Sequence, residues 1–249
     1  MRKHSTYPKM AVVMLVVALV LALVPGWTTP ASAQSSQSDG MVCTSGPNFS
    51  LTSHTGYIGT PDGNVVFMWG LSSGADDFQY PGPVLCVNEG DTVTVVLHNT
   101  LNRGISLIFP GQENVLADGQ PDGPVFNGAT LVSLAKVAGA NGGTVTYSFV
   151  ATHPGTFLYQ SGTDPAIQVP MGLFGAIVVR PAGHPDWVYN RPETAFNPTH
   201  EYIALLSEID PVLSQKMEAG QPFNSKNYHP RYWMINGRGF PDTVAPNFA

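Results

Sequence analysis

Between residues 41 and 180, short segments of apolar and β-branched residues alternate with turn clusters rich in Gly, Asn, Asp and Pro. Within several of these segments, apolar and polar positions alternate with a period of two. The segments cover residues 65–69, 92–97, 131–134, 144–150, 155–159 and 176–179. A period of two is typical of strands with one buried face, and many short strands between turns are typical of sandwiches and barrels. The pattern therefore predicts an all-β domain, specifically an antiparallel β-sandwich.

The pattern changes at residues 180–185, where two prolines and a glycine indicate a linker. Beyond the linker, residues 202–206 and 232–235 are predicted strands. Asp210 and Pro211 have the N-cap and first-turn chemistry of a short helix, and Gly220 ends that helix. These elements supply too few strands to form a core alone. We therefore expect them to pack on the first domain or to belong to a longer protein.

The N-terminus has the three parts of a secretory signal peptide. Arg2, Lys3 and Lys9 are followed by an apolar run at residues 11–24 and by the small residues 31–33. The alternative is an uncleaved membrane anchor, but the apolar run is shorter than the ~20 residues that a spanning helix needs. We predict a signal peptide at residues 1–33, a polar spacer and entry at 34–44, and secretion to the periplasm, cell surface or medium.

Charge narrows the possible partners. The chain has a formal net charge of -6, and removal of the signal peptide takes three of its 11 basic residues and none of its 17 acidic ones. The sequence has no cluster of Lys and Arg residues that could bind a phosphate backbone, so nucleic acid is not an expected partner. A stable membrane span is not expected after signal cleavage.

Two cysteines, Cys43 and Cys86, lie in the predicted mature chain. An even number of cysteines in an exported protein favours a disulfide. Two buried free thiols are the alternative. Neither cysteine belongs to a C-x-x-C pair, so a zinc or redox site is not indicated.

Two other patterns are weak signals of chemistry. Residues 70–74 match the G-x-S-x-G nucleophile elbow, but a loop-like segment follows where that motif needs a helix, so a plain turn is the simpler interpretation. Six histidines remain after signal cleavage, and none has the spacing of a paired metal ligand. They are His54, His98, His153, His184, His200 and His229.

The segment YPGPVLCVNEGDTV at residues 80–93 is followed, in order, by three further motif-like segments at residues 153–159, 172–179 and 228–237. Together these segments resemble the cupredoxin domains of multicopper oxidases and copper nitrite reductases. Residues 80–93 resemble the opening of such a domain, residues 153–159 and 172–179 resemble two of its later strands, and residues 228–237 resemble the entry to a second domain. The resemblance covers about residues 45–249. It implies a Greek-key, plastocyanin-like sandwich at 45–182, then a linker and the truncated start of a second cupredoxin-like domain at 183–249.

The same resemblance locates the family's copper ligands in this chain. Two His-x-His pairs of multicopper oxidases would fall on Ile108 and Pro110 and on Gln160 and Gly162. In nitrite reductases, the Cys, His and Met of type 1 copper would fall on Ser161, Gln168 and Leu173. None of these residues can replace the expected ligand. The resemblance therefore implies degenerate copper sites and no copper in this chain's own first domain.

Three functions follow as hypotheses. The first is an exported cupredoxin domain of a multicopper-oxidase-like protein. Copper binding and oxidoreductase activity are then expected of the full-length family member, and this domain alone is expected to be inactive. Its partners would be further cupredoxin domains, in the same chain or in another subunit. The second hypothesis is a copper-free secreted binding or structural β-sandwich module. The third is a small electron-transfer cupredoxin.

Overall fold

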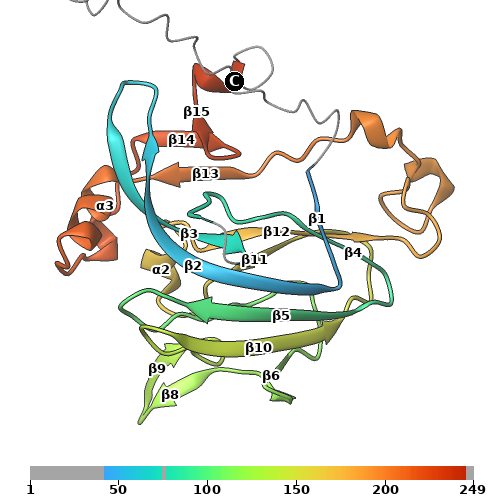
Figure 1. Cartoon of the computed structure of the whole chain (residues 1–249), viewed down its shortest axis with the longest axis horizontal. Helices are drawn as coiled ribbons and strands as arrows, with labels where there is room; N and C mark the ends of the chain where they lie inside the picture. Colours follow the sequence, from blue (N-terminus) through green and yellow to red (C-terminus); the bar gives the residue numbers. More distant parts are fainter. Residues whose placement is uncertain (1–41, 75–76, 245–249) are drawn as a thin grey trace, which may run out of the picture. The chain divides into compact units, whose positions relative to one another are not determined.

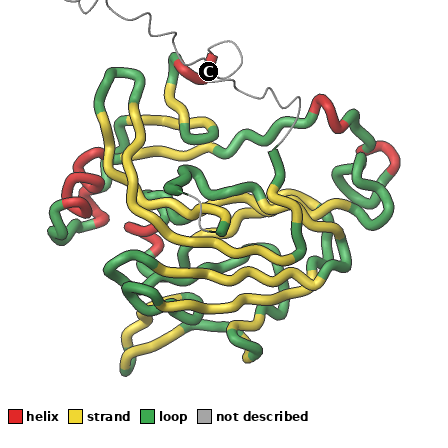
Figure 2. Tube along the Cα trace, in the orientation of Figure 1, coloured by secondary structure: helices red, strands yellow, loops and turns green. Residues whose placement is uncertain are grey.

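Strands dominate the part of the chain that the structure describes, a computed structural model covering residues 42–74 and 77–244 (Figure 1). The predicted signal peptide and residues 34–41 of the predicted spacer lie outside the described residues. Figure 2 shows that the helices are short and lie between the strands or beside them, while two packed sheets form the centre of this unit.

The larger sheet has six strands. In spatial order they are β3 (Val65–Ser73), β2 (Asn48–Gly59), β5 (Thr92–Asn99), β10 (Gly143–Val150), β6 (Leu116–Ala117) and β7 (Gln120–Pro121). The second sheet has four strands. In spatial order they are β1 (Thr44–Ser45), β4 (Leu85–Asn88), β12 (Phe174–Arg180) and β11 (Gly155–Gln160). A further two-stranded sheet consists of β8 (Val125–Asn127) and β9 (Thr130–Ser133).

The expectation of an antiparallel sandwich needs one correction, because both main sheets are mixed. Strand β2 runs parallel to β5, and β4 runs parallel to both β1 and β12. In a Greek key, sequential strands cross between sheets, so some neighbours in space are distant in sequence and run in the same direction. A period-two pattern shows which face of a strand is buried. It does not show whether the neighbouring strand runs parallel or antiparallel to it.

The core lies between the two main sheets, and the alternating pattern of the sequence builds it. On β5 the buried residues Val93, Val95 and Leu97 face the same side. The register with β10 places them opposite Phe149, Tyr147 and Val145, which are also buried. Complete burial of each aliphatic side chain stabilises the fold by roughly 1.5–3 kcal/mol. The hydrophobic pattern thus fixes which face of β5 and β10 points inward.

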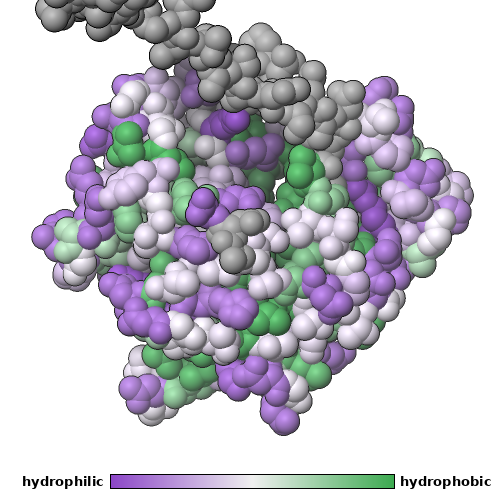
Figure 3. Space-filling model, viewed as in Figure 1, coloured by the Kyte–Doolittle hydropathy of each residue, from purple (hydrophilic) through white to green (hydrophobic). Residues whose placement is uncertain are grey.

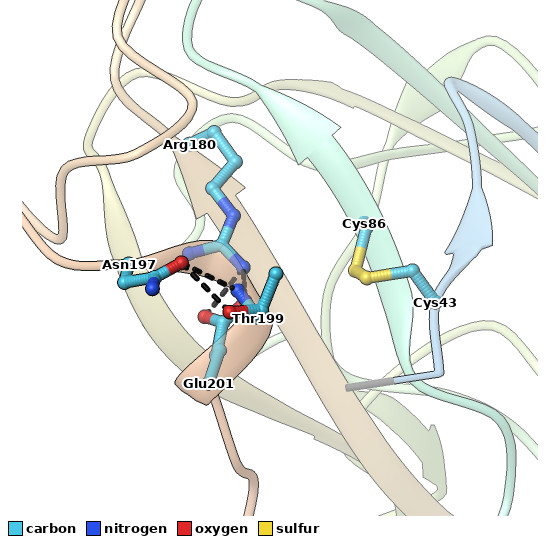
Figure 4. Close-up of polar contacts among 6 residues, drawn as sticks. All are labelled: Cys43, Cys86, Arg180, Asn197, Thr199 and Glu201. Atoms are coloured by element: carbon cyan, nitrogen blue, oxygen red, sulfur yellow. Dashed lines mark hydrogen bonds and ion pairs between the residues drawn. A yellow bond between two sulfur atoms is a disulfide. The ribbon is translucent and has the colours of Figure 1, made fainter. Parts of the chain in front are cut away.

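The segment after β12 returns along the sandwich. Arg180, at the end of β12, forms an ion pair with Glu201 (Figure 4). Its guanidinium also lies over the ring of Phe196. The segment contains two 3-10 helices, Pro192–Thr194 and Pro198–His200. Both partners of the ion pair are largely shielded from solvent, with 14% and 22% of their side chains exposed. The linker is therefore held against the end of a core strand.

The C-terminal part of the described chain forms a three-stranded sheet and one helix. The strands are β13 (Leu206–Ile209), β14 (Tyr232–Ile235) and β15 (Arg238–Gly239), and the helix is α3 (Pro211–Glu218). As predicted, the Asp210 carboxylate caps α3 by accepting a hydrogen bond from the backbone N–H of Val212 at 2.8 Å. Two further 3-10 helices cover Ser225–Asn227 and Asp242–Val244.

One face of this small sheet packs on the sandwich. Ile209 and Met234 are buried against Val66 and Met68 of β3. The strand predicted at residues 202–206 is misplaced, since β13 begins only at Leu206. The reason is Asn236. Its backbone N–H donates to the Leu205 carbonyl at 2.9 Å, but the Leu205 N–H donates to the side-chain Oδ1 of Asn236 at 2.9 Å, so a side chain replaces the backbone acceptor there.

The structure contains a disulfide between Cys43 and Cys86, whose Cα atoms lie 5.6 Å apart (Figure 4). It joins the residue before β1 to β4, beside the parallel pairing of Ser45 with Cys86. The bridge therefore anchors the entry of the described chain to the smaller sheet. Across residues 42–74 and 77–244, no helix has the length and apolar character needed to cross a membrane.

Candidate functional site

The residues that the resemblance places at copper-ligand positions lie mostly together. They come from the segment that ends at Pro110, from the last residue of β11 and the two residues after it, from the short helix α2 (Pro165–Gln168) and from the residue before β12. Ile108 and Gln160 form a backbone bridge, in which the Ile108 N–H donates to the Gln160 carbonyl at 2.8 Å. The Gln160 N–H donates to the Ile108 carbonyl at 3.1 Å. Pro110 is separate from this group and is exposed.

Ile108 fills the space above Gly162. A Cβ atom added to Gly162 would lie 2.8 Å from the Ile108 Cγ2 and 3.0 Å from the Ser106 Oγ. Carbon atoms in contact normally lie about 3.5–4.0 Å apart. Any side chain at position 162 therefore requires Ile108 to move. The two positions are coupled, because the isoleucine side chain occupies the volume that a larger residue would need.

Ser161, Gln168 and Leu173 form a buried hydrogen-bonded group. The Ser161 hydroxyl donates to the Gln168 Oε1 at 2.6 Å, and the Gln168 Nε2 donates to the Gly104 carbonyl at 3.0 Å. The Ser161 N–H donates to the Leu173 carbonyl at 2.9 Å, and the Leu173 N–H donates to the Gln168 carbonyl at 3.0 Å. The exposed fraction of each of the three residues is 3% or less. Their side-chain polar atoms are thus used within the protein.

Three hydroxyl groups form a ring beside this group. The Oγ of Ser106, the Oγ of Ser133 and the Oγ1 of Thr163 each lie 2.9 Å from the other two. The ring connects the segment before Pro110, the end of β9 and the loop before α2. The sequence gives no signal for it, because the three residues are distant in the chain and follow no periodic pattern. Only the fold brings them together.

Tyr147 of β10 reaches the same region from the core. Its hydroxyl donates to the Lys136 carbonyl at 2.6 Å and accepts from the Leu107 N–H at 3.1 Å. Burial raises the pKa of Tyr147 far above its ordinary value of 10.0, so this phenol stays neutral throughout the physiological range. A neutral hydroxyl can donate and accept at once, so Tyr147 fixes the segment before Pro110 to the segment after β9.

The donor set of this region does not fit copper. Copper in cupredoxin sites is bound by thiolate, imidazole and thioether groups. Ile108, Gly162 and Leu173 offer no side-chain donor atom, and Ser161 and Gln168 are neutral and bonded to each other. Among the residues that the structure describes, no three or more His, Cys, Asp or Glu side chains are grouped to hold a metal ion.

The weak G-x-S-x-G match is not a nucleophile elbow. Residues Gly70 to Ser73 belong to β3, and Ser72 is buried within it. An elbow needs a sharp turn from a strand into a helix that exposes the serine hydroxyl. Ser72 is paired with Thr52 of β2 and fully buried, so it cannot meet that requirement.

Part of this chain is similar in sequence to known oxidases. Residues 75–184 match the family model described as multicopper oxidase. The chain is 30% identical over 197 residues to the L-ascorbate oxidase of Cucurbita maxima. The aligned region covers 76% of this chain and 29% of that protein. The chain therefore spans less than a third of the length of this relative.

Solved structures share the fold. A blue copper oxidase from Nitrosomonas europaea has a TM-score of 0.59 at 22% identity, covering 78% of this chain and 54% of that one. A copper nitrite reductase from Nitrosomonas europaea has a TM-score of 0.51 at 20% identity, covering 84% and 62%.

The sheet order and these likenesses define an all-β, Greek-key, cupredoxin-type sandwich. Taken with the match of residues 75–184 to the multicopper oxidase model and with the likeness to L-ascorbate oxidase, they all support a multicopper-oxidase-like cupredoxin family. The members of that family are copper-dependent oxidoreductases.

Proposed function

We propose that this chain is an exported cupredoxin domain of a multicopper-oxidase-like protein, and that its sandwich at residues 45–182 is a copper-free scaffold. Copper binding and electron transfer would belong to the complete protein. In that protein, further cupredoxin domains, in the same chain or in another subunit, would supply the ligands that this sandwich lacks.

One observation carries this proposal. The positions that correspond to copper ligands are filled by packing between Ile108 and Gly162 and by the hydrogen-bonded group of Ser161, Gln168 and Leu173. A site that had merely lost its metal would leave polar atoms unpaired or space empty, and both are costly in a core. The contacts at these positions support a sandwich that is stable without a metal.

The segment from 183 to 244 supports the further proposal that a second cupredoxin-like domain starts there. The outer face of its small sheet carries three apolar side chains, those of Leu206, Ile235 and Trp233, together with the exposed Glu208 opposite Trp233. Leu206 and Trp233 are each 70% exposed. A sheet in a sandwich buries its second apolar face against another sheet. This face would be half of the core of such a second sandwich.

Export is proposed from the N-terminal pattern at residues 1–33. The Cys43–Cys86 bridge supports it, because disulfides form and persist mainly outside the reducing cytosol. We place the mature protein in the periplasm, at the cell surface or in the medium.

Copper loading of the exported protein tests the scaffold proposal. Protein purified after export is incubated with Cu(I) and Cu(II), desalted, and measured for metal content and for the absorption band of type 1 copper. We expect no stoichiometric copper and no ascorbate-dependent oxygen consumption. A blue copper oxidase loaded in parallel shows that the procedure works. One tightly bound copper per chain would refute the proposal.

The alternative function is a copper-free secreted binding or structural module. Both functions predict a metal-free sandwich in this chain. They differ in whether the complete protein has further domains that bind copper. The reading frame beyond codon 249 separates the two. Histidine-rich copper motifs encoded there support the oxidase proposal, and a frame without them favours the module.

A further inference from the structure

The tip of the hairpin formed by β8 and β9 contains an Asn-Gly pair, Asn127 and Gly128. Asn127 pairs with Thr130 across the hairpin, and Gly128 has the left-handed φ of 60° that tight hairpin turns need. Figure 1 shows β8 and β9 at the margin of the described unit. Figure 3 shows hydrophilic surface beside hydrophobic surface there, at the lower left of the view.

An asparagine that precedes a glycine can react with its own backbone. The backbone nitrogen of the glycine attacks the Cγ of the asparagine, and glycine has no side chain to hinder this approach. The chain has three Asn-Gly pairs, at residues 127–128, 141–142 and 236–237. All three have the same local chemistry, so the fold decides which of them can react.

The side chain of Asn236 is held at both ends. Its Oδ1 accepts a hydrogen bond from the Leu205 N–H at 2.9 Å. Its Nδ2 donates to the Tyr202 hydroxyl at 3.0 Å and to the Ile203 carbonyl at 2.8 Å. This amide must break three hydrogen bonds before its Cγ can turn toward the backbone of Gly237.

The pair at Asn141 and Gly142 is held through its backbone instead. The Gly142 N–H donates to the carbonyl of the buried Asn99 at 2.7 Å. The Asn141 N–H donates to the Leu101 carbonyl at 2.8 Å. The nitrogen that would attack is therefore already bound to another part of the fold.

The pair at Asn127 and Gly128 has neither restraint. Asn127 is exposed, and a Cβ atom added to Gly128 would meet nothing within 4 Å. Within residues 42–74 and 77–244, neither the Asn127 side-chain amide nor the Gly128 N–H has a hydrogen-bond partner. Both reacting groups are therefore free at the surface.

We propose that Asn127 is a site of self-catalysed deamidation. The Gly128 nitrogen forms a bond to the Asn127 Cγ, and the Cγ–Nδ2 bond breaks. The Gly128 N–H proton leaves with the amide nitrogen as ammonia. Water then opens the succinimide ring at either carbonyl, which gives aspartate or isoaspartate. The reaction consumes one water, releases one ammonia and needs no oxidant or reductant.

The modification changes the charge and the backbone of the hairpin tip. No charged residue occurs from 123 to 135, so the product introduces a carboxylate into an uncharged segment. Isoaspartate also lengthens the backbone beside the pairing of Asn127 with Thr130. The Asp122 carboxylate accepts from the Lys136 N–H at 2.8 Å and closes the base of the hairpin. The inference rests on these contacts and does not depend on the copper-free scaffold.

Peptide mass mapping of the exported protein during incubation in mildly alkaline buffer tests the inference. In the folded protein, Asn127 should lose its amide at least about tenfold faster than Asn141 or Asn236, because the protected pairs react only after local opening. In protein unfolded with guanidinium chloride, the three rates should become similar. This unfolded sample is the matched control for the intrinsic reactivity of each pair.

A variant locates the product. Asn127→Gln lengthens the side chain and disfavours the five-membered ring, so labelling of aged protein by an isoaspartate methyltransferase should fall to background. Labelling as strong as in the wild type would overturn the inference, because the isoaspartate would then lie elsewhere. Equal rates at the three pairs in the folded protein, or a rate at Asn127 below that at Asn236, would also overturn it.

Discussion

At the scale of single residues, the degenerate ligand positions form a coupled set. Gln168 bonds to Ser161 through its side-chain oxygen, to Gly104 through its side-chain nitrogen and to Leu173 through its backbone carbonyl. A neutral amide with both ends paired can be buried at little cost, while an unpaired polar group in the same place costs about 1–3 kcal/mol. Gln168 therefore acts as a structural residue at this position.

Gln168→Ala should lower the free energy of unfolding by about 2 kcal/mol, because it leaves the Gly104 carbonyl without its partner and removes the hydrogen bond from the Ser161 hydroxyl, which keeps only its contacts with the Thr163 backbone. Urea denaturation measures the change. Gln120→Ala, at an exposed position of β7, is the matched control and should change stability by less than about 0.5 kcal/mol. Equal effects of the two substitutions would show that the buried pair contributes nothing.

At the scale of elements, Asp62 links two parts of the fold. It lies in the turn between β2 and β3, where its carboxylate accepts from Thr60 Oγ1 at 2.5 Å and from Asn64 Nδ2 at 2.7 Å. It also accepts from the Tyr232 hydroxyl of β14 at 3.0 Å. The hydrogen bond from Thr60 is the largest influence that lowers the pKa of Asp62 from 3.8 to about 2. The charged carboxylate therefore helps to hold the small sheet on the hairpin.

The pH dependence follows from the sign of this shift. Because the folded pKa is depressed, the contribution of Asp62 is complete above about pH 3.8 and is lost as pH falls through about 2. NMR titration of the Asp62 carboxyl should give a midpoint near 2. Asp62→Asn should remove the pH dependence that the Asp62 carboxylate gives to the hydrogen bond from Tyr232. A midpoint at the ordinary value of 3.8 would contradict the arrangement.

At the scale of the whole molecule, the disulfide constrains the unfolded chain. It links residues that are 43 positions apart, and cross-linking a loop of this size stabilises the folded state by about 4 kcal/mol in the chain-entropy model. If the sandwich is the copper-free scaffold that we propose, covalent closure and core burial are the main constraints on the described unit.

Replacement of both cysteines, Cys43→Ser with Cys86→Ser, should lower the free energy of unfolding by about 4 kcal/mol. Denaturation of the double variant and of the oxidised wild type measures the difference. Reduction of the wild type with dithiothreitol should give a similar loss, and the double variant should be insensitive to the reductant. An unchanged midpoint would show that the bridge has no stabilising role.

The sequence by itself indicated the all-β fold, the resemblance to cupredoxins and the short helix that begins after Asp210. Each depends on local chemistry: a period of two for strands, an N-cap side chain for the helix, and motifs short enough to read along the chain. The inward face of β5 was predictable for the same reason. The start of β13 was not, because Asn236, 31 positions from Leu205, decides where the ladder begins.

Only the tertiary structure decided the parallel pairings, the hydroxyl ring and the closure of Gly162 by Ile108. These features join residues that are far apart in the chain, so no local pattern encodes them. The resemblance located the ligand positions one by one, and packing alone determined that most of them meet and that their polar atoms bond to one another. Local periodicity specifies which residues are buried, while the fold specifies which buried residues touch.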